Sequence, residues 1–376
     1  MRIALVSPYD FAVPGGVTNH IGSLANQLVT SGHYVRILTP LSQQDDAPAG
    51  QNIIPLGRPV SVPTGGSVAR LSLSVWLLPK IRELLARERF DIVHIHEPLA
   101  PLLPLSVLHF SESVNVGTFH AYHSSNRMYG WSHPVLRHWF RKLDGRTAVS
   151  PMAMKFVSRF FPGEYRIIPN GIELDYFARP RPPIPEFDDG KMNILFVGRM
   201  EKRKGLRYLI EAYSRLKWEH PNIRLIIVGP GTPGKDVYRI LGERCPEDVV
   251  FTGPVPYGEL PRYYQSCHIF CAPATGKESF GIVLLEAMAC SKPIVCTRIE
   301  GYGCVLTHGQ EGLMAPPQSS DGLAEALATL IGDADLRAQL GARGRQTAER
   351  YRWERVAAET MDYYQALLEE RRGVAV

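Results

Sequence analysis

The sequence predicts an α/β protein with two doubly wound parallel sheets. Short, continuously apolar runs alternate with helix-like segments in both halves of the chain, which is typical of buried parallel strands joined by crossover helices. A Pro-rich, acidic stretch interrupts this alternation once, at residues 179–190. The length of 376 residues also exceeds a single core, because domains hold roughly 150 residues.

The first half is expected to form one Rossmann-like domain, residues 1–178. Its apolar runs predict strands at residues 2–7, 34–40, 91–97 and 114–120. The segments between them predict helices at residues 18–30, 75–89 and 134–143. The stretch RPRPPIPEFDDG, residues 179–190, is interpreted as the interdomain linker because it is poor in regular-structure formers.

A second Rossmann-like domain is expected at residues 191–352. Strands are predicted at residues 193–198, 223–229, 249–252, 269–272 and 293–297. Helices are predicted at residues 204–217, 258–265, 281–290 and 321–331, and the segment 353–376 is predicted to be mainly one long amphipathic helix. Ligands of such sheets bind beyond the carboxyl ends of the strands, so we expect a site in a cleft between the two domains.

The composition indicates an ordinary soluble globular protein, with 45% hydrophobic and 21% charged residues. The net charge of +5 is compatible with anionic ligands such as nucleotide diphosphates or acidic lipid headgroups, and nothing indicates a nucleic-acid partner. The six cysteines form no C-x-x-C pair and are expected to be reduced thiols. The chain starts on a strand and has no apolar run of 18 residues, so we expect a cytoplasmic protein, peripheral to the inner membrane face at most.

Three motifs carry candidate chemistry, and the first is Pro14-Gly15-Gly16-Val17. It lies between the first strand and a helix that Thr18 is expected to cap. Adjacent glycines let the backbone approach a phosphate closely, and a helix N-terminus offers free N–H groups. The alternative is a glycine turn that binds nothing.

The second motif is G-R-M-E-K-R-K-G, residues 198–205, which follows the first strand of the second domain. Arg199 can clamp a diphosphate with its planar fork, and Lys204 can add a compact positive charge. The alternative is a solvated basic loop.

The third motif, residues 276–287, is the most specific. Glu278 lies in the loop after a strand, and Glu286 lies in the helix that Gly281 opens. The N–H groups around Phe280–Ile282 can meet an anion there, and a carboxylate deeper in the helix can accept hydrogen bonds from ribose hydroxyls. The alternative is two surface glutamates, but Glu286 is surrounded by apolar residues and would be costly to bury without a partner.

Together with P-N-G-I at residues 169–172 and the late YRWERV, these motifs resemble glycosyltransferase family 4 over nearly the whole chain. Within the family the pattern is most similar to mannosyltransferases that act on an inositol phospholipid. The resemblance implies the GT-B fold, with the C-terminal helix crossing back to the first domain. It also implies that His120, Glu278, Arg199 and Lys204 are catalytic, and that the donor is bound by Gly15, Gly16, Arg199, Lys204, Glu278, Ser279, Phe280, Gly281, Ile282 and Glu286.

The implied reaction moves a hexose from a GDP- or UDP-sugar to a hydroxyl acceptor with retention of anomeric configuration. Mannose is favoured over glucose or GlcNAc, and neither a metal nor another cofactor is expected. The leaving phosphate would help to deprotonate the acceptor, so the main requirement is to stabilise charge on the diphosphate. Because these groups come from both domains, we expect the chemistry to need domain closure.

The first domain, which is expected to bind the acceptor, matches the mannosyltransferase pattern less well than the second domain does. Tyr9 and Arg70 match acceptor-lining positions, but Thr18 replaces Gln, Leu99 replaces Asn, and the run after His120 reads A-Y-H-S. Because polyols are read by hydrogen bonds, these changes predict a shifted acceptor, still expected to be a lipid or lipid-linked glycan. A nucleotide-sugar epimerase of the same fold and a non-catalytic nucleotide-binding module are the alternative functions.

Four other signals compete with this interpretation. The glycine pattern at residues 229–234 is followed by no acidic residue at the next strand's end, which argues against a dinucleotide site. His94 and His96 point to one face near His120 and His123, where zinc is conceivable, but satisfied core residues or pocket lining are favoured and no metal site is predicted. Asp333-Ala334-Asp335 is interpreted as a helix cap. The basic amphipathic segments 75–89 and 134–143 could lie on an anionic membrane or pack inward.

Overall fold

The computed structural model describes residues 1–13, 15–42, 52–64, 67–72, 75–120, 127–244 and 248–373. The chain divides into two compact units. Unit 1 comprises Met1–Gly171 and Trp353–Val376, and unit 2 comprises Ile172–Arg352. Each unit is a parallel sheet with helices on both faces, so the predicted α/β, doubly wound class is confirmed.

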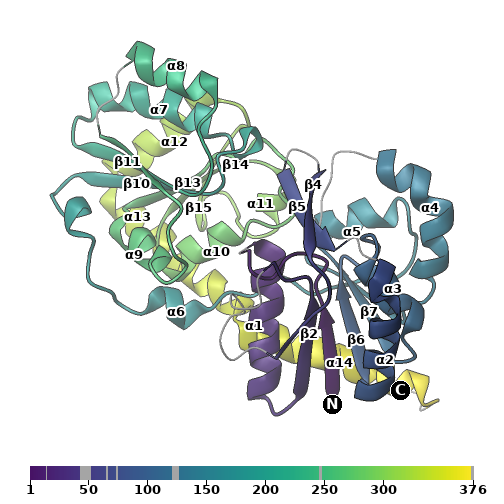
Figure 1. Ribbon diagram of the computed structural model, residues 1–376. Helices are drawn as coiled ribbons and strands as arrows, with labels where there is room; N and C mark the ends of the chain where they lie inside the picture. Colours follow the sequence, from purple (N-terminus) through teal and green to yellow (C-terminus); the bar gives the residue numbers. More distant parts are fainter. Residues whose placement is uncertain are drawn as a thin grey trace. The chain divides into compact units, whose positions relative to one another are not determined.

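The sheet of unit 1 has the strand order β3-β2-β1-β6-β7-β8-β9 and is parallel throughout (Figure 1). Its central strands are almost wholly buried, as the apolar runs predict. A short antiparallel hairpin, which the sequence patterns did not reveal, extends from the chain after β3. The strands are β1 (Arg2–Val6), β2 (Tyr34–Thr39), β3 (Ile53–Pro55), β4 (Pro59–Thr64), β5 (Ser67–Ser72), β6 (Ile92–His96), β7 (Val114–Phe119), β8 (Gly145–Ala148) and β9 (Arg166–Ile167).

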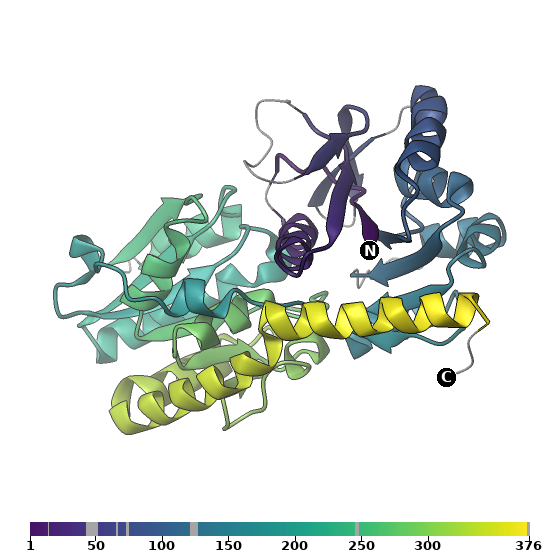
Figure 2. The same ribbon diagram turned by 90° about the horizontal axis from the view of Figure 1, so that it is seen from below.

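Helices cover both faces of this sheet because side chains alternate along each strand. Along β1, Ile3 and Leu5 pack with α1 and α14, whereas Ala4 and Val6 pack with α2 and α3. Figure 2 shows α14 as one long yellow helix along unit 1, which confirms that the C-terminal helix returns to the first domain. The helices are α1 (Gly16–Thr30), α2 (Leu78–Glu88), α3 (Leu103–Phe110), α4 (Arg127–Phe140), α5 (Pro151–Ser158) and α14 (Trp353–Arg371), with a 3-10 turn at Val75–Leu77.

Unit 2 repeats the design with the order β12-β11-β10-β13-β14-β15, again parallel throughout. Two apolar clusters cover the two faces of its sheet. The strands are β10 (Met192–Val197), β11 (Ile223–Val228), β12 (Val249–Gly253), β13 (Ile269–Ala272), β14 (Ile294–Thr297) and β15 (Gly312–Ala315). The helices are α6 (Leu174–Ala178), α7 (Leu206–Glu219), α8 (Lys235–Arg244), α9 (Leu260–Ser266), α10 (Ile282–Ala289), α11 (Glu300–Gly303), α12 (Ser320–Gly332) and α13 (Ala334–Ala348), with 3-10 turns at Pro185–Phe187, Lys202–Lys204 and Glu349–Tyr351.

The unit boundary lies earlier than the predicted linker. The chain passes from unit 1 to unit 2 after Gly171, not within residues 179–190. The Pro-rich stretch packs on unit 2: the backbone N–H of Arg181 donates to Gln265 Oε1 at 3.0 Å, and Phe187 is buried in the core of that unit. Apart from the 3-10 turn at Pro185–Phe187, the segment has no helix or strand, and hydrogen bonds together with the buried Phe187 ring hold it against unit 2.

Two helix predictions need correction. α1 begins at Gly16, so Thr18 lies in its first turn and does not cap it. The segment 75–89 is a 3-10 turn followed by α2, whose apolar residues Ile81, Leu84 and Leu85 are buried in the core of unit 1. The apolar face of this helix therefore packs inward and does not lie on a membrane. Among the helices of the described ranges, none combines the length and apolarity that crossing a bilayer requires.

Candidate active site

In unit 2 the two charged motifs meet where the strand order reverses. β10 and β13 are neighbours in the sheet. The strands that follow β10 in the chain are added towards one edge of the sheet, and those that follow β13 are added towards the other edge. The carboxyl ends of β10 and β13 therefore form the topological switch point. The loop after β10 carries Arg199 and Lys204, and the loop after β13 carries Glu278. The backbone N–H of Thr275 donates to the carbonyl of Arg203 at 2.8 Å and joins the two loops. The fold therefore brings together residues that are about 75 positions apart.

Glu278 lies at the centre of a charge cluster. Its Oε1 contacts Lys204 Nζ at 2.8 Å and pairs with the Arg203 guanidinium, which also binds Glu201 through Nε at 2.7 Å. The Glu278 side chain is only 13% exposed, and the two cations offset the cost of burying its carboxylate. Arg199 pairs with Glu201 at 3.4 Å and is 52% exposed, which leaves its guanidinium available to a ligand. The basic motif is therefore not a freely solvated loop.

Glycines allow these loops to approach each other. Gly205 has φ +73°, and a Cβ there would lie 1.9 Å from the carbonyl oxygen of Pro273. Gly229 has φ +144°, and its Cβ would lie 2.0 Å from the carbonyl oxygen of Gly198. The loop at residues 229–234 thus serves this close packing, and the next strand, β12, ends in Gly253 with no carboxylate.

α10 begins beside this cluster and carries Glu286. Its N-cap is Gly281, which has no side chain to accept from the first-turn N–H groups, and its φ of +94° requires glycine. Glu286 is buried, and its Oε2 accepts a hydrogen bond of 2.6 Å from Tyr264 Oη. Burial raises the pKa of Glu286 from 4.5 to about 7, although the Tyr264 hydrogen bond and Lys204 oppose the shift. The alternative of two surface glutamates is wrong.

Unit 1 has its own switch point, between β1 and β6. Gly15 is the N-cap of α1, and a Cβ on Gly16 would meet no protein atom of the described residues within 4 Å. The packing of unit 1 therefore leaves space over Gly16 that a ligand can use. Pro14 and residues 121–124 lie outside the described residues.

His120 follows β7 and belongs to a group of four buried histidines. His96 Nδ1 is hydrogen-bonded to His120 Nε2 at 2.8 Å, and the backbone N–H of His120 donates to Glu97 Oε1 at 2.8 Å. His20 of α1 meets both rings edge-on, with centroids 4.9 Å from His120 and 5.2 Å from His96. Burial holds the pKa of all four rings below the ordinary value of 6.5, to about 4 for His20 and about 3 for His94.

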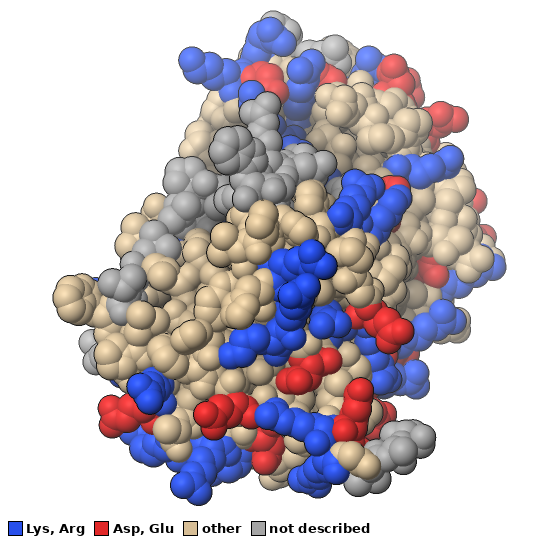
Figure 3. Space-filling view, turned by 90° about the vertical axis from the view of Figure 1, so that its right-hand side faces the viewer, with Lys and Arg blue, Asp and Glu red and all other residues tan. Residues whose placement is uncertain are grey.

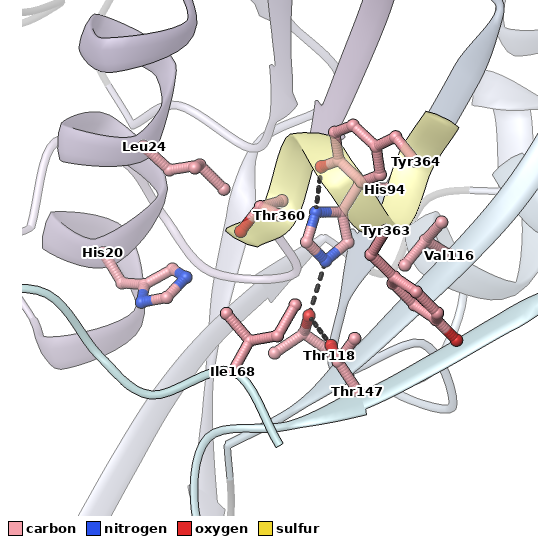
Figure 4. Close-up of a pocket in the computed structure, with 10 residues that line it drawn as sticks. All are labelled: His20, Leu24, His94, Val116, Thr118, Thr147, Ile168, Thr360, Tyr363 and Tyr364. Carbon is pink, nitrogen blue, oxygen red and sulfur yellow. Dashed lines mark hydrogen bonds between the residues drawn. The ribbon is translucent and has the colours of Figure 1, made fainter. Parts of the chain in front are cut away.

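His94 precedes His96 by two residues on β6, and Figure 4 shows its surroundings. Its Nδ1 is hydrogen-bonded to the hydroxyl of Tyr364 from α14, and its Nε2 to Thr118 Oγ1, which continues to Thr147. The ring stacks on His96 at 4.4 Å between centroids. His94 is thus the satisfied core histidine that the sequence predicted, whereas His96 and His120 lie closer to the strand ends.

The predicted acceptor residues separate into two kinds. Tyr9 and Arg70 lie together, because Tyr9 bridges to Leu71 and the next residue, Asp10, pairs with Arg70 at 3.5 Å. Burial raises the pKa of Tyr9, and nearby Glu97 adds to the shift. Thr18 and Leu99 are both buried: the Thr18 hydroxyl donates to the carbonyls of Val13 and Gly15, and Leu99 belongs to the apolar core.

Several partners were not found from the sequence, namely His20, Asp10, Arg203 and Tyr264. Arg203 was visible only as one of several basic residues. His20 and Tyr264 sit on helices with no local motif to single them out. Asp333 caps α13 by accepting from the N–H of Leu336, as predicted. The five cysteines in the described ranges are free thiols.

Sequence comparisons match this chain to known proteins over nearly its whole length. The profile described as Glycosyltransferase Family 4 matches residues 14–176, and the profile described as Glycosyl transferases group 1 matches residues 180–347. The phosphatidyl-myo-inositol mannosyltransferase of Mycolicibacterium smegmatis is 34% identical over 98% of this chain and 94% of its own length.

This chain belongs to glycosyltransferase family 4.

Solved structures support the fold of this glycosyltransferase. Sucrose-phosphate synthase from Thermosynechococcus elongatus superposes with a TM-score of 0.79 at 21% identity, over 98% of this chain and 100% of that one. Anabaena Alr3699/HepE, solved with UDP and glucose, gives a TM-score of 0.78 at 19% identity, over 97% of this chain and 100% of that one. The fold is GT-B, as predicted, and the chain is a transferase of glycosyl groups.

Proposed function

We propose that this glycosyltransferase moves a hexose, mannose in the first place, from a nucleotide diphosphate sugar to a hydroxyl of a lipid or lipid-linked acceptor, with retention of configuration. The observation that carries the proposal is the cluster at the switch point of unit 2. Glu278, whose side chain is only 13% exposed, is held by Lys204 and Arg203 and lies in the loop that leads into the uncapped helix start at Gly281. This combination suits a donor with sugar hydroxyls and a diphosphate.

Each group has a distinct role in the proposed transfer. The N–H groups at the start of α10, with Lys204 and the half-exposed Arg199, take up the negative charge that develops on the departing diphosphate. Glu278 accepts hydrogen bonds from sugar hydroxyls, and Glu286 accepts from the ribose. Phe280 contributes only its backbone, since its ring is buried in the core of unit 2.

His120 is the proposed partner of the reacting sugar in unit 1. Burial keeps the pKa of His120 well below 6.5, so the ring is neutral at pH 7 and serves as a hydrogen-bonding group and not as a cation. The departing phosphate then takes the acceptor proton. No metal is needed for this step, because the cations and helix dipoles of unit 2 supply the positive charge.

The acceptor is proposed from Tyr9 and Arg70. Arg70 is 49% exposed and paired only at 3.5 Å with Asp10, so it can bind a phosphate of the acceptor. The hydroxyl of Thr18 is already used by backbone carbonyls, and Leu99 offers no polar atom. The relative from M. smegmatis is named for phosphatidyl-myo-inositol. We propose a phosphate-bearing acceptor with a different pattern of hydroxyls.

Thermal unfolding with GDP, UDP and their hexose derivatives tests the donor. A nucleotide that binds only the folded protein raises its stability, by about 2.7 kcal/mol at one hundred times Kd. We expect GDP or UDP to stabilise the wild type and to lose this effect in Arg199→Ala. Equal stabilisation of both proteins would remove Arg199 from the donor site.

Incubation with the stabilising sugar nucleotide then tests the reaction. We expect an α-linked product from an α-linked donor only when acceptor is present, and full turnover after EDTA treatment. An epimerised donor formed without acceptor would contradict transfer, and turnover that EDTA abolishes and a divalent ion restores would contradict metal independence.

We also propose a peripheral contact with an anionic membrane. Trp76 is 87% exposed in the 3-10 turn that precedes α2, and Lys80 and Arg82 of α2 are exposed as well. On the face that Figure 3 presents, Lys and Arg side chains are interspersed with Asp and Glu side chains. Vesicles with anionic lipid should retain the wild type and release Trp76→Ala. Trp218→Ala, which removes an 85% exposed ring from unit 2, is the control, and equal release of both variants would refute the contact.

A further inference from the structure

Three of the buried histidines of unit 1 come from separate elements and meet at one point. His20 lies on α1, His96 on β6 and His120 after β7. One ring nitrogen from each lies within 4.8 Å of the other two. Sequence patterns pointed to His94 and His123 as companions of His96 and His120, but His94 is committed to Tyr364 and Thr118. His123 lies outside the described residues, and the fold adds His20 to His96 and His120.

The hydrogen bonds around these rings do not use every ring nitrogen atom. His20 Nδ1 is hydrogen-bonded to Asn170 Oδ1 at 2.9 Å. This hydrogen bond fixes the ring and leaves Nε2, on the opposite side of the ring, free of Asn170. His96 uses Nδ1 on His120, and its Nε2 is buried without a hydrogen-bond partner among the described residues. A buried polar atom without a partner is costly, and a ligand that accepts its lone pair would relieve that cost.

Three neutral imidazoles with one open position are the donor set of many zinc sites. Tetrahedral zinc with Zn–N of about 2.05 Å sets the nitrogen atoms roughly 3.3 Å apart. The three ligand nitrogen atoms lie within 4.8 Å of one another, so each pair must close by about 1.5 Å at most. Side-chain rotations can provide such shifts. Asn170 acts as the outer partner that fixes one ligand.

We propose that His20, His96 and His120 form an inhibitory site for zinc or a similar imidazole-preferring transition metal ion. Mg²⁺ and Ca²⁺ are excluded as occupants because they prefer oxygen ligands. The inhibition rests on the proposed function: a metal bound to His120 withdraws that ring from the sugar and places two positive charges beside the reacting centre. The metal is thus an antagonist of the transfer and not its cofactor.

The test is a calorimetric titration of the full chain with ZnCl₂ after EDTA dialysis and without a histidine tag. We expect one equivalent bound by the wild type and binding at least tenfold weaker in His20→Gln and His96→Gln. Asn170→Ala keeps all three ligands and should weaken binding 10- to 100-fold. His109→Gln, which alters an exposed histidine of the same unit, should bind as the wild type does. Thermal melts confirm that each variant is folded.

Transfer measured over the same zinc range tests the inhibition. We expect turnover to fall in parallel with occupancy, to return with EDTA, and to be unaffected by Mg²⁺. Binding that is equal in wild type and His20→Gln would overturn the site. Stoichiometric binding with undiminished turnover would overturn the inhibitory role. If the chain transfers no sugar at all, the proposed function fails, and the titration still decides the metal site by itself.

Discussion

The pH dependence of Glu286 offers a sharp test of the site in unit 2. Glu286 is buried, and its pKa is about 7 in the folded protein, compared with 4.5 in the unfolded chain. Between these values the folded state binds more protons than the unfolded state, so the free energy of unfolding falls as pH rises. The penalty is absent below pH 4.5 and complete above pH 7.

The size of this effect follows from the shift. A difference of about 2.5 pKa units corresponds to roughly 3 kcal/mol at pH 8. Glu286→Gln stays neutral at every pH and can still accept from Tyr264 Oη. We therefore expect the variant to match the wild type near pH 4.5 and to be more stable by about 3 kcal/mol at pH 8 in the absence of nucleotide.

Hydrogen exchange of amides in β13 and β14 measures this difference, because fully buried core strands are expected to exchange through unfolding of the whole unit. Comparing variant with wild type at each pH cancels the titration of other groups. Glu325→Gln, an exposed glutamate of α12, is the matched control and should differ little at any pH. A stability difference that is constant from pH 5 to pH 8 would refute the raised pKa. Saturating nucleotide should reduce the difference, since ribose hydroxyls that donate to Glu286 favour its charged form.

The remaining predictions separate function from stability. Glu278→Gln and His120→Ala should each lower turnover by about 10²-fold or more without loss of the folded state. His120→Ala keeps the backbone N–H that donates to Glu97. Full activity in either variant would remove that residue from the site. Gly16→Ala should leave the melting temperature unchanged or slightly raised, since its Cβ meets no described atom within 4 Å, yet weaken nucleotide binding at least tenfold; unaltered affinity would show that no phosphate approaches there. Gly205→Ala should cost about 3 kcal/mol of unit 2 stability, because φ is +73° and the Cβ would lie 1.9 Å from a carbonyl oxygen. Gly332→Ala, with open space around it, is the control and should cost little. Equal urea midpoints for the two variants would contradict this account.

The sequence alone predicted the parts of this protein that depend on short-range order. Buried parallel strands are continuous apolar runs, so most strands of the two sheets and the helices between many of them could be predicted. The glycine and charge motifs lie at strand ends by their spacing, which located Gly16, Lys204, Glu278 and Glu286 as candidates. The shortest strands and the β4–β5 hairpin were missed, because a few residues carry too little periodicity.

Tertiary structure decided which side chains act as partners. Strand order places the loops after β10 and β13 next to each other, and so joins Arg203 to Glu278 across 75 positions. It buries Glu286 against Tyr264, and it brings His20 from α1 to the two histidines of β6 and β7. The same packing turned the predicted linker into part of unit 2. Such partners come from segments that are distant in the sequence. A local residue pattern predicts whether a segment is a helix or a strand, but it does not predict which other segments pack against it.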